Sequence, residues 1–178
     1  MKRIKVHDKE FEIFIPGDRL QTVISEMAEQ INHDLAGREV IFMGILNGAF
    51  MFASDLVRQI RLDCQITFLK LASYTGTSST GNVKRLIGIN EDIYNKTVVI
   101  LEDIVDTGVT LEDIIKQLTG YEPREIRVAT MLLKPEAYLK NIPIDYVGIE
   151  IPREFVVGYG LDYEGYARNL TDIYKVTK

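Results

Sequence analysis

Continuous apolar runs alternate along the chain with segments in which apolar residues recur at every third or fourth position. The continuous runs predict strands, most of them buried on both faces of a sheet. We expect these strands at residues 10–15, 40–46, 65–74, 97–103, 125–134, 146–150 and 155–160. The periodic segments predict amphipathic helices. We expect these helices at residues 18–35, at 49–60 and from Gly108 to about Gly120.

The first and third predicted helices have clear boundaries. Asp18 can cap the N-terminus of the first helix and Gly37 can end it, while Pro123 lies beyond the end of the third. The apolar residues at helical spacing are Leu20, Val23, Ile24, Met27, Ile31 and Leu35 in the first helix, and Leu111, Ile114, Ile115 and Leu118 in the third. Each helix therefore has one face suited to a sheet.

Buried strands that alternate with amphipathic helices indicate an α/β fold, in which a mostly parallel central sheet has helices on both faces. Ligands of such folds bind at the carboxyl ends of the strands. The short segments that follow the predicted strands are Leu46-Asn47-Gly48, Ala72-Ser73-Tyr74, Glu102-Asp103 and Leu133-Lys134. We therefore expect the functional residues among them.

Composition narrows the class of protein. The 178 residues are 46% hydrophobic and carry a net charge of −5, which fits a globular domain with a sizeable core and disfavours a broad nucleic-acid surface. A single cysteine, Cys64, cannot form an internal disulfide and favours a reducing compartment. No signal-peptide pattern and no apolar stretch of about 18 residues is present. We expect a cytoplasmic protein with no membrane or nucleic-acid partner.

The segment VVILEDIVDTGVTL, residues 98–111, runs from a predicted strand through a glycine turn into a predicted helix. Backbone N–H groups at the start of a helix have no partner within the helix, and the helix dipole favours an anion there. Gly108 permits close approach of the backbone, and Thr107 and Thr110 add hydroxyl donors. Residues 106–110 therefore suit a phosphate, although an ordinary capped helix is the alternative.

Two adjacent acids, Glu102 and Asp103, precede this loop and would repel a bare anion. A ribose resolves the conflict, because its hydroxyls donate to carboxylates while its 5′-phosphate reaches the loop. A divalent cation could offset the remaining negative charge. The segment has no Gly-Lys-Ser/Thr and is therefore not a Walker A loop. The pattern favours a sugar with a phosphate attached.

The acid-acid pair, two apolar residues and Asp-Thr-Gly-x-Thr after a buried strand resemble the phosphoribosyl-pyrophosphate motif of the type I phosphoribosyltransferases, and the resemblance extends over nearly the whole chain. It implies one domain, 1–178, with that family's fold and a small hood formed by the N-terminal strand and residues 151–178. It also implies that the motif binds phosphoribosyl pyrophosphate. The motif residues are Glu102, Asp103, Ile104, Val105, Asp106, Thr107, Gly108, Val109 and Thr110.

The resemblance gives roles to two further strand ends. Leu46, Asn47 and Gly48 resemble a turn that, in the family, contains a cis peptide and presents backbone N–H to pyrophosphate. Asn47 stands where relatives commonly have lysine, so that charged contact is lost; a plain Asn-Gly turn is the alternative. Ser73 and Tyr74, followed by residues 75–82, resemble a lid that excludes water, and a surface loop is the alternative.

On the base side, the resemblance implies that Lys134 donates to O6 of a 6-oxopurine, that Phe155 stacks on the ring and that the backbone of Val156 reads the base edge. Without the resemblance, Lys134 would be interpreted as an ordinary lysine at a strand edge, and Phe155 and Val156 as core side chains. Asp162 resembles a magnesium ligand and Arg168 a pyrophosphate-binding arginine; an exposed polar face is the alternative. With Glu102 and Asp103, Asp162 completes the predicted Mg²⁺ set.

The implied reaction joins hypoxanthine or guanine to phosphoribosyl pyrophosphate in purine salvage. Asp106 would exchange a proton with N7 of the base. The implied assembly is a homodimer or homotetramer. Three alternatives remain: a nucleotide-sensing regulator on the same fold, an enzyme that prefers xanthine or guanine, and a generic α/β domain.

Overall fold

The computed structural model describes residues 3–72, 84–89 and 91–177. Its larger sheet has six strands in the order β5-β4-β3-β6-β7-β8. The strands are β3 (Val40–Leu46), β4 (Cys64–Ala72), β5 (Lys84–Ile87), β6 (Thr97–Val105), β7 (Glu125–Leu133) and β8 (Tyr146–Glu150). All neighbours pair in parallel except β5, which runs antiparallel to β4 and was not predicted. The mostly parallel sheet is confirmed.

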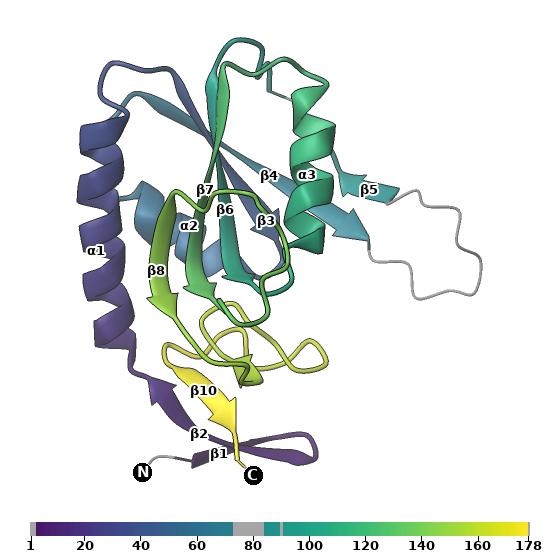
Figure 1. Cartoon of the computed structure of the whole chain (residues 1–178). Helices are drawn as coiled ribbons and strands as arrows, with labels where there is room; N and C mark the ends of the chain where they lie inside the picture. Colours follow the sequence, from purple (N-terminus) through teal and green to yellow (C-terminus); the bar gives the residue numbers. More distant parts are fainter. Residues whose placement is uncertain (1–2, 73–83, 90, 178) are drawn as a thin grey trace.

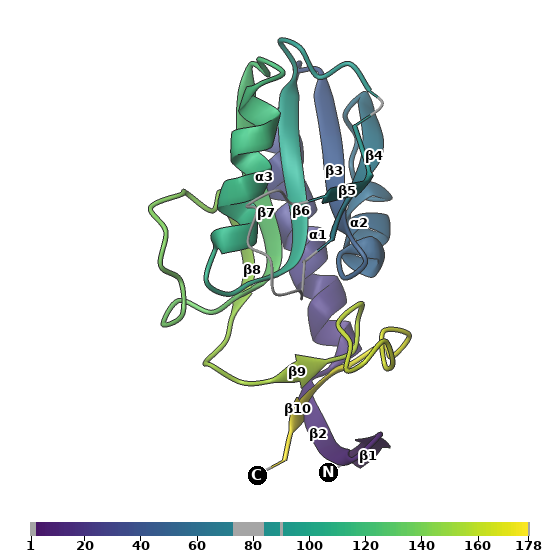
Figure 2. The same cartoon turned by 90° about the vertical axis from the view of Figure 1, so that its right-hand side faces the viewer.

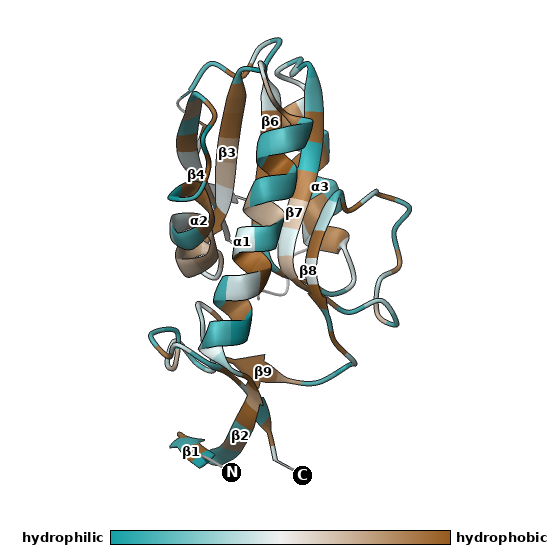
Figure 3. Cartoon of the chain, turned by 90° about the vertical axis from the view of Figure 1, so that its left-hand side faces the viewer, coloured by the Kyte–Doolittle hydropathy of each residue, from teal (hydrophilic) through white to brown (hydrophobic). Residues whose placement is uncertain are grey.

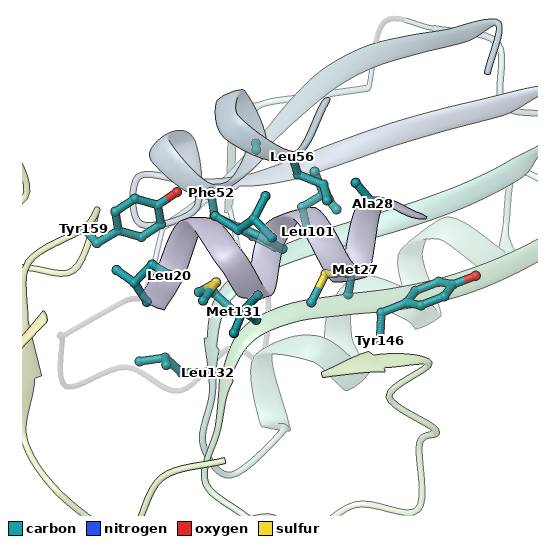
Figure 4. Close-up of a cluster of buried hydrophobic side chains, with 14 of the residues drawn as sticks. Leu20, Met27, Ala28, Phe52, Leu56, Leu101, Met131, Leu132, Tyr146 and Tyr159 are labelled. Atoms are coloured by element: carbon teal, nitrogen blue, oxygen red, sulfur yellow. The ribbon is translucent and has the colours of Figure 1, made fainter. Parts of the chain in front are cut away.

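Helices cover both faces of this sheet, as predicted (Figures 1 and 2). One core cluster joins α1 (Gly17–Asp34) and α2 (Phe50–Val57) to one face, and another joins α3 (Val109–Thr119) to the other. The alternating bands of hydrophilic and hydrophobic residues along α1 are visible in Figure 3. Figure 4 shows part of the first cluster, in which α1 packs on the sheet and against α2. The prediction of a sheet with helices on both faces is therefore confirmed.

Two predicted helix boundaries were wrong. Pro16 rather than Asp18 occupies the N-cap, and α1 begins at Gly17, whose N–H donates to the carboxylate of Asp172 at 2.9 Å. A side chain from the other end of the chain therefore caps this helix. The second helix stops at Val57, because the residues up to 60 form turns through 3₁₀-type backbone hydrogen bonds.

A second, antiparallel sheet has the order β1-β2-β10-β9 and brings the two ends of the chain together (Figure 1). Its strands are β1 (Arg3–Val6), β2 (Lys9–Ile15), β9 (Val156–Val157) and β10 (Ile173–Val176). The sequence did not predict β1 or β10. The predicted strand 155–160 shrinks to the two residues of β9, because Gly158 and Gly160 take φ of 99° and 96° and turn the chain.

The strand order places the change of winding direction between β3 and β6. From β3 the chain moves to β4 on one side, whereas β6, β7 and β8 follow on the other. Ligands of open α/β folds bind outside the carboxyl ends of the strands at such a switch point, which here lies after β3 and β6. In the part of the chain that the structure describes, no helix is both long and apolar enough to cross a membrane.

Candidate active site

The loop after β6 turns into α3 at Gly108, as its sequence predicts. Gly108 caps α3 with φ of 81°, a left-handed conformation that side chains rarely adopt. The ring of Tyr138 and the stem of Lys140 lie directly against its Cα, so a Cβ would not fit there. The backbone carbonyl of Thr107 accepts from the N–H of Leu139 at 3.2 Å. The 135–145 loop therefore supports this turn from outside.

Glu102 and Asp103 lie at the end of β6 in a setting that opposes their charge. Glu102 is 7% exposed, and burial, followed by the repulsion of Asp103, raises its pKa well above the usual value. Burial also raises the pKa of Asp103 to about 6, although the N–H of Ile104, which donates at 2.9 Å, opposes that rise. A buried carboxyl group beside a partly buried one, both with a raised pKa, is poised for a ligand that donates hydrogen bonds or carries positive charge.

The turn after β3 contacts this acid pair. The peptide between Leu46 and Asn47 is cis, as predicted from the resemblance. The carboxyl group of Asp103 lies against Cα of Gly48, in the space that a Cβ would occupy. The ends of β3 and β6, more than 50 residues apart in the sequence, therefore form one surface.

Asp106 and Lys134 form an ion pair of 2.8 Å between the loop after β6 and the end of β7. The Lys134 side chain is 13% exposed and that of Asp106 is 47% exposed. Both line a pocket of about 430 Å³ that also includes Thr107 and Phe155. The structure thus places the predicted proton carrier, the predicted base donor and the predicted stacking ring around one cavity.

Phe155 enters the pocket from the second sheet. Its ring is 44% exposed, and the remainder packs against Tyr163 at 5.8 Å and Phe11 at 6.2 Å between centroids. The ammonium group of Lys9 lies 5.3 Å from the ring centre. Val156 is buried and pairs with Lys175 in β9 and β10, so only its backbone can serve a base. An exposed aromatic face backed by packing suits a planar ligand.

Asp162 and Arg168 form an ion pair of 2.6 Å in the segment after β9. Arg168 also donates to the carbonyl of Gly160 at 2.6 Å. The charges of both side chains influence the pKa of Asp103, Arg168 lowering it and Asp162 raising it. This pair is therefore close to the acid pair of β6, although it lies about 60 residues away in the sequence.

Among the residues that the structure describes, no three metal-binding side chains gather into a cluster. Mg²⁺ needs fewer protein ligands than that, because it binds one or two carboxylates together with substrate phosphates and water. The buried, like-charged pair of Glu102 and Asp103 fits such a partial site. The predicted lid, Ser73, Tyr74 and residues 75–82, lies outside the described residues.

Several residues that line the pocket were given no individual role from the sequence. Ala137, Leu139, Arg153 and Glu154 line it, and Arg153 donates to the backbone carbonyl of Glu136. They come from two segments without regular structure, so no periodicity could have indicated them. The proline after Lys134 was a local sign of a loop at that point.

Comparisons with known proteins agree with this geometry. A model of the phosphoribosyl transferase domain matches residues 16–164. This chain belongs to the phosphoribosyltransferase family, with the type I fold.

The relatives that resemble the chain act on a particular kind of base. A hypoxanthine-guanine phosphoribosyltransferase of Mycobacterium bovis is 40% identical over 90% of this chain and 83% of its own. A hypoxanthine phosphoribosyltransferase of Escherichia coli K12 is 39% identical over 93% and 94%. A solved hypoxanthine-guanine phosphoribosyltransferase of Bacillus anthracis aligns with a TM-score of 0.86 at 38% identity, covering 94% of this chain and 97% of its own.

Proposed function

We propose that the chain transfers a phosphoribosyl group from phosphoribosyl pyrophosphate to hypoxanthine and guanine, a reaction of purine salvage. The observation that carries the proposal is the pocket in which Asp106, Lys134 and Phe155 meet beside the loop after β6. The similarity to hypoxanthine(-guanine) phosphoribosyltransferases over more than nine-tenths of the chain supports it. Neither a regulatory protein nor a xanthine enzyme is favoured by any of these observations.

The phosphoribosyl part of the substrate would lie along the end of β6. The amides at the start of α3 and the Thr107 and Thr110 hydroxyls would bind the 5′-phosphate, with Gly108 allowing close approach. Glu102 and Asp103 would accept from the ribose hydroxyls. Ile104, Val105 and Val109 complete the loop, whose shape depends on their backbone.

The pyrophosphate would lie between the Asn47-Gly48 turn and the Asp162–Arg168 pair. Arg168 offers a planar set of donors, and the turn offers backbone N–H groups. Glu102 and Asp103 would hold Mg²⁺ with the help of substrate oxygens, and Asp162 would reach it directly or through water. When bound, Mg²⁺ would neutralise charge that develops on the leaving group. The bond from C1′ to the pyrophosphate oxygen breaks as the bond from C1′ to N9 forms.

The ion pair of Asp106 and Lys134 matches one edge of a 6-oxopurine. N7 and O6 lie side by side on that edge. Lys134 would donate to O6 while Asp106 takes the proton of N7 as N9 bonds to the sugar, and would return it in the reverse reaction. Adenine presents an amino donor where O6 stands, which leaves the lysine without an acceptor. Phe155 would stack on the ring face, and the Val156 backbone would contact its edge.

A phosphoribosyl transfer assay with Mg²⁺ and each of hypoxanthine, guanine, xanthine and adenine tests the proposal. With hypoxanthine and with guanine, we expect the corresponding nucleotide to form, together with one pyrophosphate for each nucleotide. No product from any of the four bases would reject the enzyme, and dominant use of xanthine would reject the assigned specificity.

The cellular setting and assembly of the enzyme belong to the same proposal. We propose a cytoplasmic homodimer or homotetramer without a nucleic-acid or membrane partner. Light scattering on the purified chain tests the assembly, for which a monomer at micromolar concentration would be the contrary result.

A further inference from the structure

Tyr159 lies between the second sheet and the helices of the larger one. Its side chain is 3% exposed, and its hydroxyl donates to Oδ2 of Asp55 on α2 at 2.7 Å. The amide of Gln21 on α1 donates to the same oxygen, also at 2.7 Å. In Figure 4 Tyr159 lies at the end of the cluster where α1 begins. One carboxylate oxygen thus joins α1, α2 and the segment after β9.

The residue that follows Tyr159 carries this attachment into the active site. Gly160 lies with its Cα against the backbone carbonyl of Gly48, at a distance that excludes a Cβ. Its own carbonyl accepts from Arg168 at 2.6 Å, and its N–H donates to the carbonyl of Arg168 at 2.9 Å. The position of Gly160 therefore fixes the guanidinium group that would bind pyrophosphate.

The other side of the attachment also leads to the pyrophosphate region. Asp55 lies on α2, which begins at Phe50, directly after the turn of Asn47 and Gly48. The N–H of Ala49 donates to the backbone carbonyl of Ile45 at 3.1 Å. The turn is therefore hydrogen-bonded to β3 at the point where α2 begins. A hydrogen bond between Asp55 and Tyr159 consequently links the two loops between which the pyrophosphate would lie.

We propose that Tyr159 and Asp55 are positioning residues for the pyrophosphate part of the substrate: their hydrogen bond holds the Arg168 loop against the turn at Gly48. This inference rests on the proposed function. Neither side chain is required to touch the substrate. Burial and the carboxylate hold the pKa of Tyr159 above its usual range, so its hydroxyl remains a donor at every working pH.

The matched experiment compares Tyr159→Phe with Tyr146→Phe. Tyr146 is 2% exposed and its hydroxyl accepts from Arg127 at 3.1 Å, but it lies at the opposite end of the cluster in Figure 4. Both substitutions remove one buried hydroxyl that forms a hydrogen bond with a charged side chain. A loss of stability alone should therefore affect them similarly, whereas a positioning role should affect only Tyr159.

We expect Tyr159→Phe to raise KM and Kd for phosphoribosyl pyrophosphate about tenfold, since a hydrogen bond to a charged group is lost between the two loops. KM for hypoxanthine should change less than about twofold, because the base pocket is formed elsewhere. Asp55→Ala should behave like Tyr159→Phe, and the double variant should be no worse than either. Asp55→Asn retains an acceptor and should restore most of the affinity. Tyr146→Phe should leave all constants unchanged.

Binding is measured by calorimetry with phosphoribosyl pyrophosphate and Mg²⁺, in addition to turnover. Equal melting temperatures with equal affinities in the two tyrosine variants would overturn the inference, as would a rise in KM for hypoxanthine as large as that for phosphoribosyl pyrophosphate. Wild-type protein that binds phosphoribosyl pyrophosphate without transferring it would reject the proposed function while the affinity comparison still decides the positioning role. Absence of binding by the wild type would reject both.

Discussion

The two halves of the site are built in different ways. The phosphoribosyl half, residues 102–110, is one continuous segment whose shape follows from a strand, a glycine turn and a helix start. The base half is assembled from Lys134 after β7, the 135–145 loop and residues 153–155 before β9, and it meets the first half at Asp106 and Thr107. A continuous half can be recognised in a sequence and should serve every base equally. An assembled half depends on tertiary packing and is where base preference can be set.

Replacement of Asp106 by Asn should have the largest effect. The amide cannot take the proton of N7, so kcat should fall by about 10²-fold or more while affinity for phosphoribosyl pyrophosphate is largely retained. Steady-state kinetics and calorimetry measure the two quantities. Asp113→Asn, which makes the same change on α3 without touching the pocket, is the control. Near-normal turnover of Asp106→Asn would remove Asp106 from catalysis.

Replacement of Lys134 by Met should impair recognition of the base more than the transfer of the phosphoribosyl group. Loss of the donor to O6 should lower kcat/KM for hypoxanthine about 50-fold and leave that for adenine nearly unchanged. The ratio of the two constants is the quantity to measure. Lys116→Met, which removes an exposed lysine of α3, should leave the ratio as it is. Equal losses with both bases would contradict the division into two halves.

Replacement of Asp103 by Asn should stabilise the ligand-free protein and weaken its substrate binding. The folded-state pKa of Asp103 is about 6, above the usual 3.8, so the folded state binds the proton more tightly than the unfolded state. The resulting instability is complete above pH 6 and disappears as the pH falls toward 3.8. At pH 8 the variant should therefore gain about 1 to 3 kcal/mol in the free energy of unfolding.

The gain should shrink below pH 6 and be absent near pH 4, which denaturant unfolding at several pH values can measure. The same variant should bind phosphoribosyl pyrophosphate with Mg²⁺ more weakly at pH 8. Asp113→Asn serves as the control here too. If the Asp103 variant were less stable than wild type at pH 8, the raised pKa would be wrong.

Replacement of Phe155 by Leu should have the smallest effect of the four. Loss of a stacking surface should raise KM for hypoxanthine about tenfold and leave kcat within a few-fold. KM for phosphoribosyl pyrophosphate should stay near its wild-type value, since Phe155 belongs to the assembled half. Tyr166→Leu changes another exposed aromatic residue outside the pocket and should be neutral. An equal rise in KM for both substrates would contradict the division of the site into a phosphoribosyl half and a base half.

The difference between the halves also explains what the sequence could predict. The core strands of the parallel sheet and the faces of α1 and α3 followed from local apolar patterns. The strands β1, β5 and β10 did not, because each has four residues and depends on a partner for its pairing. One of the two partners of β10 is β2, about 160 residues away.

The site divides in the same way. The phosphate loop and the acid pair could be interpreted from residues 98–111 alone. Phe155 and Val156 could not, because aromatic and valine residues in a strand are more often core, and only the resemblance gave them a role. The contact of Asp103 with Gly48 and the bond of Tyr159 to Asp55 join segments that no local pattern connects.

The most direct test of the account is the ratio of kcat/KM for hypoxanthine to that for adenine in the wild-type protein, with phosphoribosyl pyrophosphate and Mg²⁺. A site that offers Lys134 to O6 predicts a ratio of about 10³ or more, because adenine would leave the lysine unpaired. Comparable use of the two bases, or no transfer to hypoxanthine, would contradict the account.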